Sequence, residues 1–224
     1  MIEASKPDNK ANIKRLINYY EDHITHDPNI TLVKKEANYD MLVQGGYDAV
    51  IIAIGGKTRI LDVPGSDKSS VVYANDYLNG SRVVDGKNVV IIGGGITGAE
   101  TALELDNDGK NVTIVEMADT FLANSGSSCQ AYNIAIAQSN IKIMTGKRLV
   151  AVEDNGVVLI DRWGNENTVD ADNVVIAAGF TPQYDLANQL EENTEMEVYN
   201  IGDSKKVRQI YDAIHEGFIA ARQI

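Results

Sequence analysis

Short apolar runs alternate with amphipathic stretches along most of the chain, and this alternation predicts an α/β fold with parallel strands. Runs rich in Val and Ile with little polar interruption are typical of buried strands. The predicted strands are residues 31–34, 48–54, 87–92, 111–116, 141–144, 173–178 and 199–203. Apolar residues at helical spacing predict helices over residues 9–24, 73–78, 96–108, 128–139 and 206–222. Residues 148–153, 157–160 and 167–169, separated by glycine-containing turns, predict an antiparallel β-meander.

Two stretches share one plan, in which an apolar strand is followed by a glycine and then by extended chain containing proline. They are IAIGGKTRILDVPG, residues 52–65, and IAAGFTP, residues 176–182. This shared plan indicates two crossings between domains. We therefore expect residues 71–176 to form an inserted domain, and residues 1–66 with 181–224 to pack together as a second one.

A glycine fingerprint, G-x-G-x-x-G, follows the predicted strand 87–92 and opens the predicted helix 96–108. In this context Gly93 permits the tight turn, Gly95 lets the backbone approach a pyrophosphate, and Gly98 lets the helix pack close to the strand. The free N–H groups at Ile96 and Thr97, with the positive end of the helix dipole, suit that anion. The pattern predicts a dinucleotide site, the alternative being a glycine turn that binds nothing.

An acid, Glu116, ends the next predicted strand, 23 positions after Gly93. The fingerprint places such an acid about 20 residues on, where it accepts hydrogen bonds from ribose hydroxyls. A carboxylate there repels the 2′-phosphate of NADP, and residues 117–119 carry no basic side chain. The sequence therefore favours NAD(H) over NADP(H). The alternative for Glu116 is a solvated acid at a strand end, and the helix dipole alone could explain Glu100.

Composition narrows the class of protein further. The 224 residues include 44% hydrophobic residues, and the net charge is −12. Such an acidic globular chain is a poor candidate for binding nucleic acid or an anionic membrane, since both require clustered Lys and Arg. We expect a cytoplasmic protein, since the polar start shows no secretory signal and no apolar run approaches the ~20 residues of a membrane span.

Cysteine and histidine are too sparse to indicate a metal or redox site. The single cysteine, Cys129, permits no internal disulfide, no CxxC pair and no zinc or iron–sulfur cluster. His23, His26 and His215 are too scattered to indicate a metal site. We therefore predict no metal ligand in this chain.

Several motifs resemble those of flavoproteins with two dinucleotide-binding domains, a family that includes glutathione and thioredoxin reductases. GGGITGAE (93–100) is similar to the pyridine-nucleotide motif of that family, and AIGG (53–56) and AAGF (177–180) resemble its crossover motifs. YNIGD (199–203) resembles its C-terminal FAD motif. Residues 3–24 and 81–102 further resemble the C-terminal third of the NADH:flavin oxidoreductases, relatives of old yellow enzyme such as 2,4-dienoyl-CoA reductase and 2-enoate reductase.

The resemblance implies a path for electrons and a set of cofactor contacts. In the intact enzyme NADH passes hydride to FAD, and electrons then reach an unsaturated enoate or enoyl substrate through a 4Fe–4S cluster and FMN in upstream domains. Glu100 would flank the nicotinamide, Gly179 and Phe180 would line its pocket, and Asp203 would meet the ribityl chain of FAD. No residue of this chain is assigned a catalytic role. The expected cofactor-binding residues are Gly93, Gly94, Gly95, Ile96, Thr97, Gly98, Glu100, Glu116, Met117, Gly179, Phe180, Gly202 and Asp203.

The chain also departs from that family. No glycine fingerprint for FAD precedes residue 87, and the barrel and the cluster cysteines are absent. We expect a fragment of a larger enzyme, with a complete NADH domain and a truncated FAD-type domain, inactive alone and partnered by the remaining domains. Its uncovered sheet edge would favour self-association. One alternative is a stand-alone NADH-binding or sensor module without catalysis. Another, a disulfide reductase subunit, is disfavoured by the missing CxxC.

Overall fold

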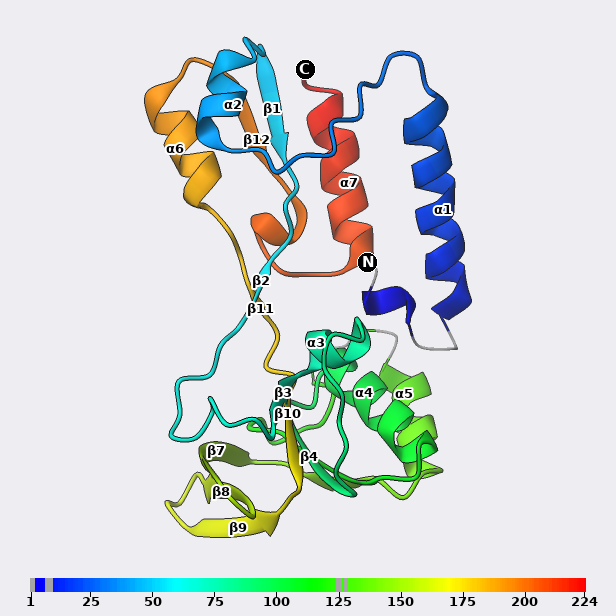
Figure 1. Ribbon diagram of the computed structural model, residues 1–224, viewed down its shortest axis with the longest axis vertical. Helices are drawn as coiled ribbons and strands as arrows, with labels where there is room; N and C mark the ends of the chain where they lie inside the picture. The colour runs from blue at the N-terminus through cyan, green and yellow to red at the C-terminus, as the bar shows by residue number, and fades with distance from the viewer. Residues whose placement is uncertain (1–2, 7–9, 124–125, 127–128) are drawn as a thin grey trace. The chain divides into compact units, whose positions relative to one another are not determined.

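The computed structural model describes residues 3–6, 10–123, 126 and 129–224. The chain divides into two compact units, a larger one of residues 1–27 with 60–179 and a smaller one of residues 28–59 with 180–224. Figure 1 shows the elements of each unit. The chain passes between the units three times, after residue 27, after residue 59 and after residue 179, and the last two passages fall within the stretches 52–65 and 176–182.

A five-stranded parallel sheet forms the centre of the larger unit, with strand order β3-β10-β4-β5-β6. Its strands are β3 (Val71–Tyr73), β10 (Asn173–Ile176), β4 (Asn88–Ile92), β5 (Asn111–Val115) and β6 (Lys142–Met144). Because side chains alternate between faces, Val89 and Ile91 pack with the helices, whereas Val90 and Ile92 pack with the meander. Both faces are therefore covered, as the continuous apolar runs predicted.

Helices cover one face of this sheet and the meander covers the other (Figure 1). The helices are α3 (Ala74–Leu78), α4 (Ile96–Asn107) and α5 (Cys129–Ala137). The meander consists of β7 (Lys147–Glu153), β8 (Gly156–Asp161) and β9 (Glu166–Asp170), paired antiparallel in that order. The predicted meander and its two turns are confirmed.

The N-terminal segment groups with the larger unit. It contains the short 3-10 helix η1 (Glu3–Ser5) and the helix α1 (Ala11–His26). The element η1 lies against α3, and Lys10 forms an ion pair with Glu100 of α4. These contacts are the physical reason why the described residues before 28 group with residues 60–179, and not with 181–224 as the predicted domain boundaries had them.

The smaller unit is built around two parallel strands, β1 (Ala49–Ile52) and β12 (Glu197–Asn200). Its helices are α2 (Tyr39–Gln44), α6 (Asp185–Asn193) and α7 (Ile210–Ala221), and η4 (Gly202–Ser204) is a 3-10 turn. The core is small, with Val50 and Ile52 of β1 packed against Ala187 and Leu190 of α6. At the two crossings β2 (Lys57–Thr58) pairs antiparallel with β11 (Phe180–Thr181).

Most predicted elements are present, with ends shifted by a few residues, and one is wrong. Residues 31–34 form no strand, and Leu32 and Val33 are more than half exposed because no described strand lies beside them. The helices α2 and α6 and the short strands β2, β3 and β11 were not predicted. Asn9 and Ser128, where two helices were expected to begin, lie outside the described residues.

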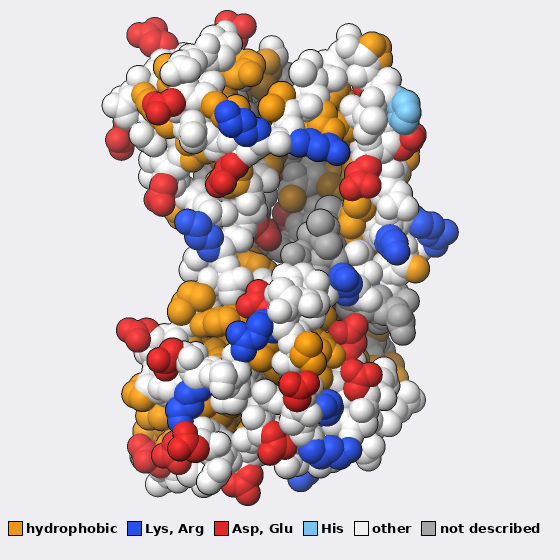
Figure 2. Space-filling view, viewed as in Figure 1, with side chains coloured by type: hydrophobic (Ala, Val, Ile, Leu, Met, Phe, Trp, Pro, Cys, Tyr) orange, Lys and Arg blue, Asp and Glu red, His pale blue; other side chains and the backbone are white. Residues whose placement is uncertain are grey.

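The surface carries both signs of charge. Acidic and basic side chains are interspersed over the visible face (Figure 2). Among the described helices, none combines the length and the hydropathy needed to cross a membrane.

Candidate nucleotide-binding site

The glycine turn lies where β4 ends, at the carboxyl edge of the parallel sheet between β10 and β5. Backbone hydrogen bonds hold it from two sides. The N–H of Gly93 donates to the carbonyl of Val115 at 2.8 Å, and the N–H of Leu122 donates to the carbonyl of Gly94 at 3.0 Å. Ligands of open parallel sheets bind at this edge, beyond the carboxyl ends of the strands.

Two of the glycines are required by packing. Gly93 has a φ of +116°, and a Cβ there would lie 2.3 Å from the carbonyl oxygen of Ala177. A Cβ on Gly98 would lie 2.0 Å from the carbonyl oxygen of Gly93. The first glycine thus permits the turn, and Gly98 permits α4 to lie close to it, as the fingerprint predicted.

Gly95 differs from its neighbours. Its backbone is extended, with φ −81° and ψ −172°, and a Cβ there would meet no atom of the described residues within 4 Å. The described fold therefore leaves space for a Cβ at this position. Gly95 is also the N-cap of α4 and makes no side-chain cap hydrogen bond. The first N–H groups of the helix, at Ile96 and Thr97, thus begin beside an open cradle.

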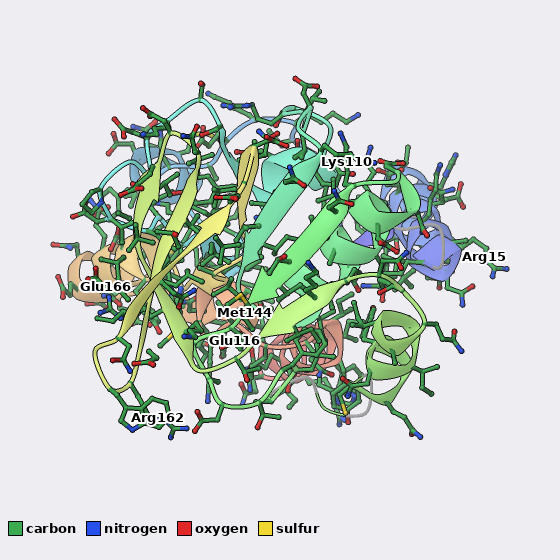
Figure 3. All side chains as sticks on the ribbon, turned by 90° about the horizontal axis from the view of Figure 1, so that it is seen from below. Arg15, Lys110, Glu116, Met144, Arg162 and Glu166 are labelled. Carbon is green, nitrogen blue, oxygen red and sulfur yellow. The ribbon has the colours of Figure 1, made fainter. Side chains whose placement is uncertain are left out.

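Glu116 follows β5 and reaches back to the glycine turn. Its Oε2 accepts a hydrogen bond from the N–H of Gly94 at 2.6 Å, and its Oε1 accepts one from the N–H of Ala118 at 2.7 Å. In Figure 3, Glu116 lies next to Met144 at one end of the sheet, and its backbone N–H donates to the Met144 carbonyl. The half-buried carboxylate is therefore fixed beside the turn and is not a fully solvated strand-end acid.

The same contact explains a glycine to which the fingerprint gives no role. A Cβ on Gly94 would lie 2.9 Å from the Cβ of Glu116 and 2.9 Å from a ring carbon of Phe121. Close by, Leu122 is buried and has a φ of +57°, unusual for a residue with a side chain. The expected contact residue Met117 is 72% exposed at the start of this loop.

Glu100 is buried, with 6% of its surface exposed, on the second turn of α4. Its Oε1 accepts a hydrogen bond from the Tyr132 hydroxyl of α5 and forms an ion pair with Lys10 Nζ. Burial, and then the hydrogen bond and charge of Glu100, raise the pKa of Tyr132 well above its ordinary value. Tyr132 therefore stays protonated and donates at neutral pH. Sequence spacing pointed to neither partner.

In the smaller unit Gly202 and Asp203 form the 3-10 turn that precedes α7. The N–H of Gly202 donates to Glu216 Oε2 at 2.7 Å, and Asp203 Oδ1 accepts from the N–H of Arg208 at 3.0 Å. Glu216 also pairs with Arg208. Burial opposes ionisation of Glu216, but Arg208 and the Gly202 N–H outweigh it and lower its pKa. The turn is thus tied to α7 by a charged side chain.

The expected site residues divide between the two units. Those from Gly93 to Gly98, with Glu100, Glu116 and Met117, share the larger unit, which ends at Gly179, where φ is +84°. Phe180 begins β11 of the smaller unit, which also holds Gly202 and Asp203. The structure brings the fingerprint and Glu116 together. The contacts of Gly179, Phe180 and Asp203 with a cofactor stay predictions.

This fold belongs to a known class. The chain is a member of the pyridine nucleotide-disulphide oxidoreductase family, whose model matches residues 4–217. Within that class it is similar to reductases of the kind that the sequence resemblance predicted. It is 32% identical to the cinnamate reductase of Clostridium sporogenes, over 100% of this chain and 34% of the relative. It is 31% identical to the NADH oxidase of Thermoanaerobacter brockii, over 99% of this chain and 35% of the relative.

A solved structure supports the same assignment. The 2-naphthoyl-CoA reductase complex matches with a TM-score of 0.87 and 30% identity, over 99% of this chain and 34% of that one. The predicted family resemblance and the Rossmann-like α/β fold are therefore confirmed. The chain spans about a third of the length of these relatives.

Proposed function

We propose that this chain is the NADH-binding portion of a larger flavin-dependent oxidoreductase. It would pass hydride from NADH to FAD for reduction of an unsaturated enoate or enoyl substrate elsewhere in the enzyme. The observation that carries the proposal is the bond between Glu116 and the N–H of Gly94, beside the open cradle at Gly95. This bond holds Glu116, the proposed partner of the ribose hydroxyls, next to the glycine turn, the proposed pyrophosphate site.

The residues present fit NAD(H). Open space at Gly95 admits a pyrophosphate close to the backbone, where the N–H groups of Ile96 and Thr97 can donate to its oxygens. Glu116 is held in place to accept from the ribose hydroxyls of the adenosine half. When bound, NADH supplies the hydride, while the chain binds and orients it.

The residues fit FAD only in part. Gly202 and Asp203 form an ordered turn tied to α7, suited to the sugar-alcohol part of FAD. A second glycine fingerprint that would hold the FAD pyrophosphate is not found before residue 87. FAD affinity would therefore depend on the remaining domains of the parent enzyme, and FMN and a 4Fe–4S cluster would belong to those domains.

The smaller unit has exposed features that other domains of the proposed larger enzyme would cover. Its parallel sheet has two strands among the described residues, β1 and β12. Parallel sheets occur almost only where both faces are covered by other parts of the protein. Four large apolar side chains of this unit are between 38% and 67% exposed: Ile51 of β1, Ile54 just after β1, and Tyr211 and Phe218 of α7. Figure 2 shows hydrophobic side chains on its visible face. Remaining domains of a larger enzyme would cover such a surface.

Cofactor preference tests the proposal. NADH should bind the unmodified chain more tightly than NADPH, because Glu116 repels a 2′-phosphate. Replacement Glu116→Arg should narrow or reverse the preference. The control is Glu166→Arg, which makes the same change of charge on exposed β9 and should leave the preference unchanged. Fluorescence titration with both nucleotides provides the measurement. Equal affinity of the unmodified chain for NADH and NADPH would contradict the assignment of Glu116.

A further inference from the structure

Glu100 is the one carboxylate among the described residues that is buried. A buried charge is costly unless it is paired and hydrogen-bonded. Two partners from different elements meet this need at the same oxygen, the hydroxyl of Tyr132 on α5 and the ammonium of Lys10 at the start of α1. Glu100 lies close to the start of α4, beside the candidate nucleotide site. A favourable interaction with the helix dipole does not require burial and two dedicated partners, so we infer an additional role for this carboxylate.

The two partners act differently. Lys10 is a flexible chain that ends in a point charge, so it neutralises Glu100 without fixing its plane. Tyr132 is a rigid ring whose hydroxyl has one proton, and this proton is donated to Glu100 Oε1. Tyr132 is therefore the partner that orients the carboxylate.

We propose that Tyr132 is a positioning residue, which through Glu100 holds the nicotinamide half of NADH. This inference rests on the proposed function. Glu100 is four residues after Ile96, so both lie on the same face of α4, and Ile96 is in the first turn, whose N–H groups are assigned to the pyrophosphate. The adenosine half of the nucleotide is assigned to Glu116, across the glycine turn. The nicotinamide half, which extends from the other side of the pyrophosphate, is left for Glu100.

The test separates the two halves of the nucleotide. NADH and ADP-ribose share the adenosine and the pyrophosphate, and only NADH carries nicotinamide. Replacement Tyr132→Phe removes the hydroxyl alone and should weaken NADH binding about tenfold, because Glu100 is no longer held in the orientation in which it bonds the nicotinamide half. It should leave ADP-ribose unchanged. Glu100→Gln should show the same split, and the double variant should add little, because both changes break one interaction.

A matched control exists at the opposite end of α4. Tyr77 of α3 forms a hydrogen bond with Asp108, the C-cap residue of α4. Burial, followed by the charge of Asp108, raises the pKa of Tyr77 to about 12. Tyr77→Phe thus removes an equivalent tyrosine–carboxylate bond away from the glycine turn. It should leave the affinities for both NADH and ADP-ribose unchanged.

Calorimetric titration of the 224-residue chain with NADH and with ADP-ribose measures these effects, and circular dichroism checks that each variant is folded. An equal loss of NADH and ADP-ribose binding in Tyr132→Phe would show a structural role and overturn the inference. Unchanged NADH binding in Tyr132→Phe would overturn it as well. Failure of the unmodified chain to bind either nucleotide would reject the proposed function, and the inference with it. If the unmodified chain binds both nucleotides but Tyr132→Phe shows no selective loss of NADH binding, the inference is rejected and the proposed function stands.

Discussion

Because a Cβ fits at Gly95, we predict that one added methyl group there weakens NADH binding without changing the fold. The replacement Gly95→Ala adds a Cβ that meets nothing within 4 Å in the part of the chain that the structure describes, on a backbone with φ −81° that alanine adopts readily. The methyl group should therefore leave the fold intact and occupy the volume assigned to the pyrophosphate of NADH.

The two effects differ in size. Alanine is a poorer N-cap than glycine by about 0.5–1 kcal/mol, whereas a compatible Gly→Ala change stabilises by about 0.4–1 kcal/mol. These nearly cancel, so the free energy of unfolding should change by less than about 0.5 kcal/mol. Displacement of the pyrophosphate from one backbone N–H removes a charge-assisted hydrogen bond of about 1.5–3 kcal/mol, which corresponds to about a tenfold to hundredfold loss of NADH affinity.

Urea unfolding and NADH titration measure the two quantities separately. The contrasting variant is Gly98→Ala, in which the new Cβ would lie 2.0 Å from the carbonyl oxygen of Gly93. Such overpacking costs about 1–3 kcal/mol, so this variant should lose stability as well as binding. Full NADH affinity in a stable Gly95→Ala variant would refute the placement of the pyrophosphate at this turn.

Two further predictions concern the smaller unit. After incubation with excess FAD and desalting, the chain should be nearly colourless in an absorbance scan, because only the turn at Asp203 is present to hold FAD; stoichiometric yellow protein would contradict this. Because the folded protein lowers the pKa of Glu216, its contribution to stability is present above the ordinary value of 4.5 and is lost as the pH falls through the lowered one. The unfolding free energy of the unmodified chain should therefore fall more steeply below about pH 4.5 than that of Glu216→Gln, and parallel curves would reject the role of the Arg208 pair.

Local patterns were sufficient to predict the elements around the glycine turn. The buried strands β4, β5 and β10 are continuous apolar runs, and Gly98 is fixed by its contact with Gly93 within one βαβ unit, so the fingerprint carries this geometry. The positive φ of Gly93 belongs to the same local turn, although the atom that a Cβ there would meet is the distant Ala177 carbonyl. Where an element depends on distant partners, the same reasoning failed. Residues 31–34 have the composition of a strand, but a strand needs a neighbour to pair with. The helices α2 and α6 are short, with few buried positions to show a period.

The least predictable part of the candidate site is the environment of Glu100. Tyr132 is 32 positions away from it, and Lys10 lies on a segment that was expected to join the other domain. No spacing rule links three such residues, because their meeting depends on how α5 and the N-terminal segment pack on α4. The helix dipole, the local explanation, was incomplete for that reason.

The pairing of β2 with β11 has a consequence for the modularity of the chain. Thr58 and Phe180 are hydrogen-bonded neighbours, so the continuous segment from 60 to 179 leaves and rejoins its host at adjacent positions. Segments with adjacent ends can be removed or exchanged between proteins with little disturbance of the host. A short turn joining the two strands could replace this segment if residues 1–27, which group with it, were removed as well. Nucleotide preference could then be changed by exchanging the larger unit, with the smaller unit kept the same.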